Sequence, residues 1–151
     1  MSWIDDEIQE VEKLRLRKEL NDKKIQERER ILQTQAEVLW FHLREEFPPL
    51  VASFNQSSGR ALLEIVEVRP YGFILRREDY VKADIQFDHA SYRVNVIYLP
   101  TFSGHNKCYS IGVMPVNGVE SPVWLDAQSR DRQSDGQIAA LTIRTLLRCG
   151  L

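Results

Sequence analysis

From Trp3 to Phe47 the chain contains no proline and no glycine, the two residues that most readily interrupt a helix. The first interruption is the pair Pro48 and Pro49 in the stretch "FPPL". This absence predicts one helix of about 44 residues, which at 1.5 Å per residue would be roughly 65 Å long. Because that length exceeds the diameter of a domain of this size, we expect part of the helix to project or to lie against another chain.

The chain also has few cysteines, no long apolar run and little net charge. Cys108 and Cys149 are too few for a disulfide framework. Residues 1–13 are acidic and lack the apolar core of a secretory signal, and no stretch is apolar enough for a membrane span. The net charge of −2 gives no electrostatic reason to bind nucleic acid or an anionic membrane. We therefore expect a cytoplasmic protein with reduced thiols that binds neither.

Patterns that carry chemistry are equally scarce. The seven glycines are single and scattered, so no glycine-rich loop is present to hold a phosphate. Asp88, His89, His105 and Cys108 are the closest to a ligand cluster, but they lack the paired spacing of a zinc site. A dyad of His105 and Cys108 has no assured third group to orient the imidazole. We predict no catalytic residue, no metal and no cofactor, and interpret the chain as more typical of a non-enzyme.

What the predicted helix does contain is an apolar stripe with one interruption. Steps of four and three from Ile4 reach twelve positions, of which eight are apolar and four, between Arg15 and Glu29, are polar. Within that interruption the apolar residues are Leu14, Leu16 and Leu20, so the stripe drifts around the helix, whereas a strict coiled coil would keep its seam.

This stripe predicts that residues 1–33 project or self-associate in a coiled-coil-like manner, and that residues 34–151 form the globular part. The candidate self-association residues are the apolar ones judged too far from the core to be buried by their own chain: Ile4, Ile8, Val11, Ile25 and Leu32. The alternative is a single helix whose C-terminal third packs on its own domain while the rest is a solvated arm.

The charges of this helix are unevenly distributed. Residues 1–12 contain five acids and no base, whereas residues 13–30 contain eight bases and four acids, a net charge of +4. Acids in the first turns complement the helix dipole, which is one sufficient explanation. Antiparallel pairing of two chains, with the acidic end of one beside the basic stretch of the other, is the alternative. Exposed pairs contribute only about 0.3–0.5 kcal/mol each, so they would set orientation more than affinity.

After residue 60 the apolar period changes from helical to alternating. Segments rich in β-branched and aromatic residues follow one another with short polar links, which predicts an antiparallel meander of five or six strands. In "SYRVNVIYL" the residues Tyr92, Val94, Val96 and Tyr98 should face the core.

The last segment has the pattern of an amphipathic helix. Ser134 and Gln137 form a capping box, apolar residues from Ile138 onward supply one side, and Gly150 ends the helix. We predict an α+β fold in which this C-terminal helix packs on one face of the sheet.

These patterns lead to two functional hypotheses. The first is a non-enzymatic interaction module that forms a homodimer or higher assembly through the N-terminal helix and whose globular part binds another protein. The second is a small-molecule binding domain with a pocket between sheet and helices, lined by Trp40, Tyr92, Tyr98 and Trp124. No motif is specific enough to identify a family. The layout resembles cystatin-like folds and the dimeric chaperones of type III secretion, a likeness of architecture that implies no function.

Overall fold

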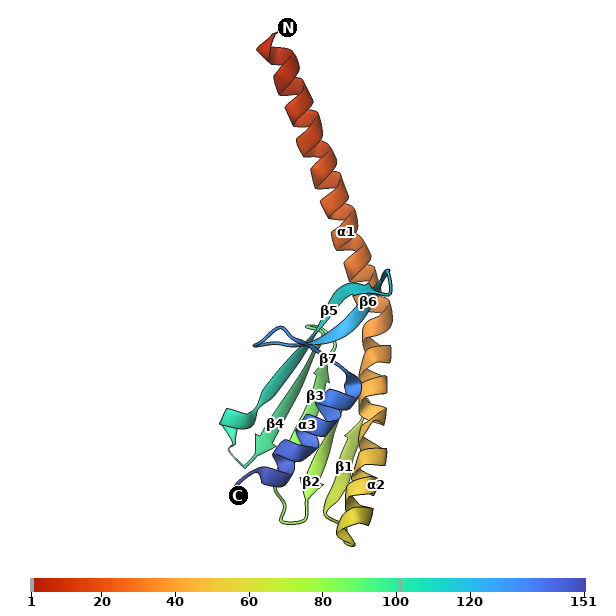
Figure 1. Cartoon of the computed structure of the whole chain (residues 1–151), viewed down its shortest axis with the longest axis vertical. Coiled ribbons are helices and arrows are strands. Elements are labelled where there is room, and N and C mark those ends of the chain that lie inside the picture. Colours follow the sequence, from red (N-terminus) through yellow and green to blue (C-terminus); the bar gives the residue numbers. More distant parts are fainter. Residues whose placement is uncertain (1, 101) are drawn as a thin grey trace.

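A computed structural model describes residues 2–100 and 102–151. Within them the fold is α+β, as predicted: helices α1 (Trp3–Glu45) and α2 (Phe47–Ser58) precede a seven-stranded antiparallel sheet, and α3 (Asp135–Arg148) follows it. The strands are β1 (Leu63–Arg69), β2 (Gly72–Arg77), β3 (Lys82–Asp88), β4 (Arg93–Leu99), β5 (Lys107–Val116), β6 (Val119–Asp126) and β7 (Arg132–Gln133), with a short 3₁₀ helix, η1 (Ser103–His105), before β5. Each strand pairs with the next one in the chain, so the sheet is a meander (Figure 1).

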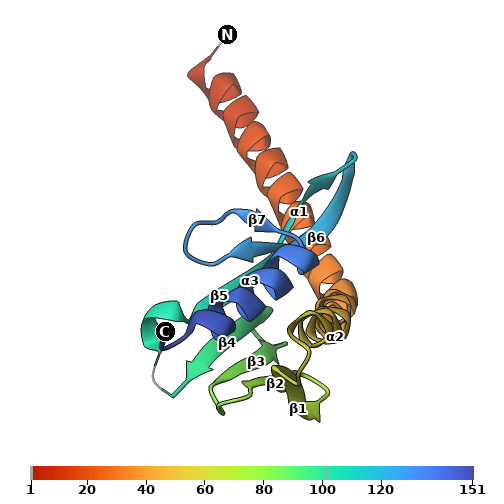
Figure 2. The ribbon, with the colours of Figure 1, turned by 60° about the horizontal axis from the view of Figure 1, so that its bottom comes forward.

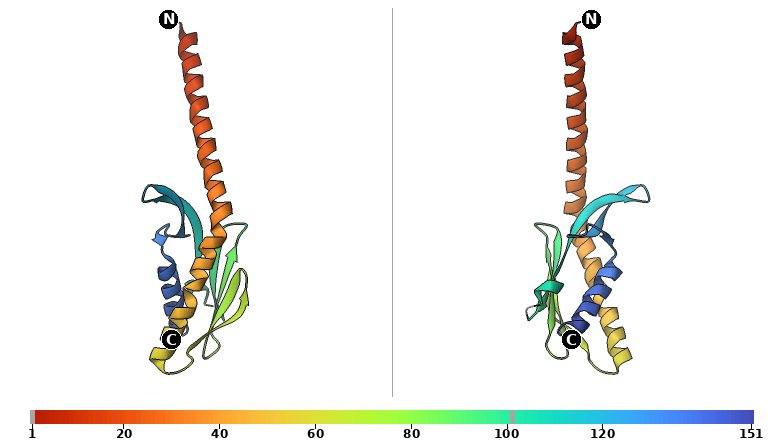
Figure 3. Two further views of the ribbon diagram at one scale, coloured as in Figure 1. Left: turned by 90° about the vertical axis from the view of Figure 1, so that its right-hand side faces the viewer. Right: turned by 60° about the vertical axis from the view of Figure 1, so that its left-hand side comes forward.

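The long helix α1 divides into a projecting part and a covered part. Its N-terminal turns extend beyond every other element, while its C-terminal turns, with α2 and α3, lie along one face of the sheet (Figures 1 and 3). Strands β5 and β6 form a long hairpin that curves toward α1 (Figure 2). None of the described α-helices lies against the opposite face of β1–β4 (Figure 3).

Pro48 and Pro49 are expected from the sequence to end the helical region, but they do not. Instead α1 ends at Glu45, and a second helix begins at Phe47 with Pro48 and Pro49 in its first turn. Proline is well accommodated there because the first backbone N–H groups of a helix have no intrahelical partner. Helix α2 then ends at Gly59, whose φ of 72° is the left-handed conformation that glycine adopts most easily.

The sheet has seven strands, one or two more than the five or six predicted. The additional strand, β7, contains only Arg132 and Gln133, which pair with Leu125 and Trp124 of β6. It lies in the polar segment between β6 and α3. Two residues are too few to show an alternating pattern, and their pairing depends on backbone hydrogen bonds that side-chain identity does not indicate.

The predicted alternation in β4 is confirmed, with one exception. Val94, Val96 and Tyr98 are buried and face the core, while Arg93 is exposed. Tyr92 does not belong to the strand: it precedes β4 in a turn, with φ of 55°, and is only partly buried. The period of two therefore holds only from the first paired residue onward.

Helix α3 begins and ends where its local signals indicate. Ser134 accepts a hydrogen bond from the backbone N–H of Gln137, whose side chain accepts one from the backbone of Ser134, so both halves of the capping box form. Gly150, with φ of 75°, follows the end of the helix. The C-terminal end of α3 is fixed by a buried arginine: the Arg77 guanidinium donates to the carbonyl oxygens of Leu146 and Cys149, both at 2.8 Å.

Candidate functional site

The projecting part of α1 is the most unusual surface of the molecule, and we refer to residues 2–30 as the arm. Every residue from Ser2 to Arg30 is exposed. Eight large apolar side chains are among them, each more than half exposed: Trp3, Ile4, Ile8, Val11, Leu14, Leu16, Leu20 and Ile25. Within the described parts of the chain, no helix is both long and apolar enough to cross a membrane. The arm therefore exposes apolar groups without the composition of a membrane span.

Most of these side chains lie on one side of the arm. At about 100° per residue, Ile4, Ile8, Val11, Leu14 and Ile25 fall within an arc of about 120°. We refer to these five residues as the arm face. Leu16 and Leu20 lie roughly opposite the centre of the arm face. The drift of the apolar stripe seen in the sequence is therefore due to these two leucines, since Leu14 lies on the arm face.

The arm face continues the side of α1 that packs on the core. Further along the same helix the buried residues Leu32, Ala36, Trp40 and Leu43 fall within the same arc. From Leu32 onward that side is covered by the chain's own sheet and helices. Before Ile31, nothing in the described residues buries it. The arm face thus continues a buried helix side, but it is interrupted by the four polar residues Arg15, Lys18, Asp22 and Glu29 and is itself uncovered.

Leu32 requires a correction. The sequence grouped it with the residues too distant from the core to be buried, but its side chain is 8% exposed and belongs to the core cluster of its own chain. The globular part therefore begins to cover α1 at Ile31. The sequence could not indicate this, because α1 packs against elements far along the chain, β5, β6 and α3 among them.

Charged side chains on the arm pair with one another along the helix. Arg15 contacts Glu12 at 2.8 Å and Glu19 at 3.8 Å, and Arg30 contacts Glu27 at 2.5 Å. The hydrogen bond from Arg30 lowers the pKa of Glu27. All of these side chains are more than half exposed, so the pairs support the helix only weakly.

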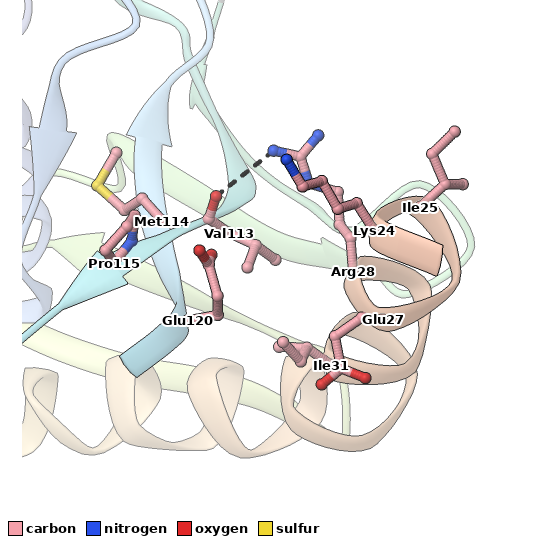
Figure 4. A pocket seen from close by; sticks show the side chains of 9 residues that line it. All are labelled: Lys24, Ile25, Glu27, Arg28, Ile31, Val113, Met114, Pro115 and Glu120. Atoms are coloured by element: carbon pink, nitrogen blue, oxygen red, sulfur yellow. Dashed lines mark hydrogen bonds between the residues drawn. The ribbon is translucent and has the colours of Figure 1, made fainter. Parts of the chain in front are cut away.

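At the base of the arm, a groove of about 430 Å³ lies between α1 and the β5–β6 hairpin. Its lining residues are Lys24, Ile25, Glu27, Arg28 and Ile31 of α1 with Val113, Met114, Pro115 and Glu120 of the hairpin (Figure 4). We refer to this as the arm groove. Arg28 reaches from α1 toward the hairpin, where its guanidinium donates to the carbonyl oxygen of Val113 at 3.4 Å (Figure 4).

The arm groove shares Ile25 with the arm face, but its other α1 residues, Lys24, Glu27, Arg28 and Ile31, lie outside the arc of that face. Its mixed lining, apolar in Ile25, Ile31 and Val113 and charged at the edges, is typical of a surface that receives an amphipathic segment. The sequence does not indicate the arm groove, because the groove is formed by residues far apart in the chain, such as Arg28 and Val113, which are 85 positions apart. The one available signal was the Asn117–Gly118 turn, which fixes where the hairpin tip lies.

The four residues suggested as a pocket lining do not surround a cavity of this kind. Trp40 and Trp124 are 0% and 1% exposed, and Tyr98 is also buried. Trp40 stacks on Phe87 with ring centroids 5.6 Å apart, and its indole N–H donates to the carbonyl oxygen of Pro70 at 2.9 Å. These large side chains fill the core, and Tyr92 packs at its edge. This packing does not support the pocket interpretation.

The residues considered for chemistry are also separated. Among residues 2–100 and 102–151, no three His, Cys, Asp or Glu side chains gather as a metal-ligand set. His105 is exposed in η1, and Cys108 is half-buried on β5. Burial raises the pKa of the Cys108 thiol, which disfavours the reactive thiolate at neutral pH.

Comparisons with known proteins add little to this geometry. No family model and no curated protein matches the chain. Among solved structures, it is similar to frataxin from Psychromonas ingrahamii, with 18% sequence identity, a TM-score of 0.38, and coverage of 64% of this chain and 78% of the frataxin chain. A likeness of that size says nothing about what this chain does.

Proposed function

We propose that the protein is a non-enzymatic assembly module that associates with copies of itself through α1. The observation that carries this proposal is the arm face: five apolar side chains that continue a buried helix side and are themselves more than half exposed. Helices in water gain most of their stability from packing an apolar side, so a long helix with an uncovered side is stabilised by association. A cytoplasmic location belongs to the proposal, in keeping with the two free cysteines.

The test is the solution mass of the full chain by light scattering, compared with two double variants of the arm. Ile8→Asp with Val11→Asp places charges on the arm face, and Leu16→Asp with Leu20→Asp places the same charges on the opposite side. We expect the native chain and the second variant to be oligomeric and the first to be monomeric. Circular dichroism of both variants would check that the helix and the globular part are retained.

A native chain that stays monomeric at micromolar concentration contradicts self-association. In that case the arm face would serve a protein of a different sequence, the other partner predicted from the sequence. An oligomer that survives in both double variants would also contradict the proposal, because the interface would then lie on the sheet or on α3.

A further inference from the structure

We infer that two arms pair antiparallel over residues 2–18 alone, so that the two globular parts lie at opposite ends of a rod. The inference rests on the proposed self-association through the arm face, and it adds a direction, a register and a length. The partner of this segment is the same segment of a second copy. Residues 19–30 of each chain stay single, and the arm groove lies outside the paired region.

The side of α1 that carries the arm face is apolar in only half of the arm. Four of its five apolar residues lie within residues 4–14, and Ile25 is the fifth. Between residues 15 and 29 the other residues on this side are charged. These are Arg15, Lys18, Asp22 and Glu29. A partner that packs on residues 4–14 therefore covers apolar side chains, whereas one that packs on residues 15–29 has to desolvate four charges.

An antiparallel overlap of residues 4–14 covers apolar side chains with apolar side chains. With Ile8 opposite Val11 of the second chain, a two-fold axis lies between them, so the contact occurs twice. The same count along the two helices places Ile4 opposite Arg15, whose long aliphatic stem can pack on it. The other charged residues of this side lie at the end of the overlap or beyond it, where they stay in water.

Charge complementarity favours this arrangement. Residues 2–7 contain three acids and no base, whereas residues 13–18, "KLRLRK", contain four bases and no acid. In the antiparallel register these segments lie beside each other, once at each end of the paired region. In a parallel pair, the five acids of residues 1–12 would lie beside the same five acids of the other chain. Opposite charges across an interface favour the antiparallel direction.

Arg15 is the base best placed to act across the pair. Asp5, Glu12 and Glu19 fall within an arc of about 40° that borders the arm face on the side of Arg15. A two-fold axis brings this same border of both helices together, so Asp5 lies at the level of Arg15 of the second chain. Within its own chain Arg15 contacts Glu12 at 2.8 Å and Glu19 at 3.8 Å. Its guanidinium then lies among acids of both chains, which offsets their mutual repulsion.

The overlap sets the distance between the globular parts. Counted through the two-fold axis, the Leu32 residues of the two chains are separated by about 45 residues of helix, or roughly 65 Å. A parallel pair would instead place the two helices about 10 Å apart at the same level. Because the arm projects beyond the other described elements, the paired region lies clear of both globular parts (Figure 1). The paired arms thus act as a spacer.

Small-angle X-ray scattering of the native dimer tests the spacing without any substitution. We expect a distance distribution with two maxima, one from distances within each globular part and one beyond about 65 Å from distances between them. A single maximum, as from two globular parts side by side, would overturn the antiparallel direction. A second maximum about 20 Å shorter would mean that the whole arm overlaps, and would overturn the register.

Added salt gives a second measurement on the native chain. Salt screens attraction between opposite charges and repulsion between like charges alike, so the sign of its effect reports the direction of pairing. We expect the dissociation constant from sedimentation equilibrium to rise several fold when salt is raised from about 50 mM to about 500 mM. A dissociation constant that falls with salt would indicate acids beside acids, as in a parallel pair.

Disulfide trapping tests the register. Ile4→Cys and Arg15→Cys in one chain lie roughly 16 Å apart along α1, too far to join within it. Both positions are exposed. Each lies opposite the other in the second chain, so mild oxidation of the double variant should give a covalent dimer. Neither single variant should do so, nor should the native chain with Cys108 and Cys149. A covalent dimer from Ile4→Cys alone would mean parallel pairing.

A charge exchange tests the contact between Asp5 and Arg15. Arg15→Glu should weaken dimerisation by several fold, and adding Asp5→Arg should restore it, because opposite charges then face each other again. Lys23→Glu makes the same change of charge on an exposed side chain beyond the overlap, and this control should leave the affinity unchanged. Loss without recovery would assign the effect to the contacts of Arg15 with Glu12 and Glu19 and contradict the register.

The outcomes separate this inference from the proposed function. A native chain that is monomeric by light scattering overturns the proposed function itself. An oligomer that Ile8→Asp with Val11→Asp dissociates, but that shows one scattering maximum or is trapped by Ile4→Cys alone, leaves self-association standing. In that case only the antiparallel overlap of residues 2–18 is wrong.

Discussion

One helix, α1, presents the same apolar side in two different surroundings. In residues 31–45 that side is covered by sheet and helices, and Trp40 and Leu43 are completely buried. In residues 2–30 the same side faces solvent, and exposed charged side chains pair with one another along the helix. The comparison teaches that the apolar period of a helix indicates which side will be covered, but not by what.

The largest expected difference between the two parts concerns their tryptophans. Trp40→Ala should lower the free energy of unfolding by about 3–5 kcal/mol, because it removes a fully buried indole stacked on Phe87 and leaves a cavity. Trp3→Ala, the same substitution in the arm, should change it by less than about 0.5 kcal/mol in a monomeric chain. Denaturant unfolding at concentrations too low for association measures both. Equal effects would mean that the arm is packed in the monomer after all.

A second expected difference concerns two adjacent arginines of the globular part. Arg77 is 7% exposed and binds the terminal carbonyl oxygens of α3, while Arg76 on the other side of β2 pairs with Glu64 at 2.5 Å near solvent. Arg77→Met should cost about 2 kcal/mol because it leaves buried carbonyl groups without donors. Arg76→Met should cost at most about 0.5 kcal/mol. The midpoints of thermal unfolding provide the comparison, and a reversed order would contradict the role assigned to Arg77.

These arginines also show how far the sequence could be interpreted. The long helix, the meander, the alternation of β4 and the ends of α3 depend on local patterns, and all four are predicted. Alternation along β2 could have placed Arg77 on the core side, but burial of an arginine is credible only once its partners at the end of α3 are known. The burial of Leu32, the two residues of β7 and the arm groove depend likewise on contacts between distant parts of the chain, which no local period contains.

A smaller expected effect concerns how stability depends on pH, and it should differ between the buried carboxylate of Asp126 and the exposed carboxylate of Glu27. Asp126 accepts backbone hydrogen bonds from Ser129 and Gln128 and contacts Lys107, and these interactions lower its pKa below the ordinary value of 3.8. A lowered folded-state pKa contributes stability that is present above 3.8 and is lost as the pH falls through the lower folded value.

Asp126→Asn should therefore lower stability by about 1 kcal/mol at neutral pH and flatten the loss of stability in acid. Glu27, whose pKa is also lowered but which is exposed in the arm, provides the matched control. Glu27→Gln should leave the pH profile of unfolding unchanged. If the Asp126 variant retains the native slope in acid, another carboxylate is responsible for it.

The smallest expected effect lies in the arm itself. Arg15 contacts Glu12 and Glu19, but all three side chains are more than half exposed, so Arg15→Ala should change arm stability by less than about 0.5 kcal/mol, and added salt should reduce the difference further. Hydrogen exchange of the arm amides in the Ile8→Asp and Val11→Asp background measures this in a monomer. Slow exchange that persists there would mean that local charge pairs hold the arm helical unaided. Fast exchange in the arm beside protected amides in residues 31–45 would mean that the arm, like the rest of α1, needs a cover on its apolar side, and that the cover comes from another chain.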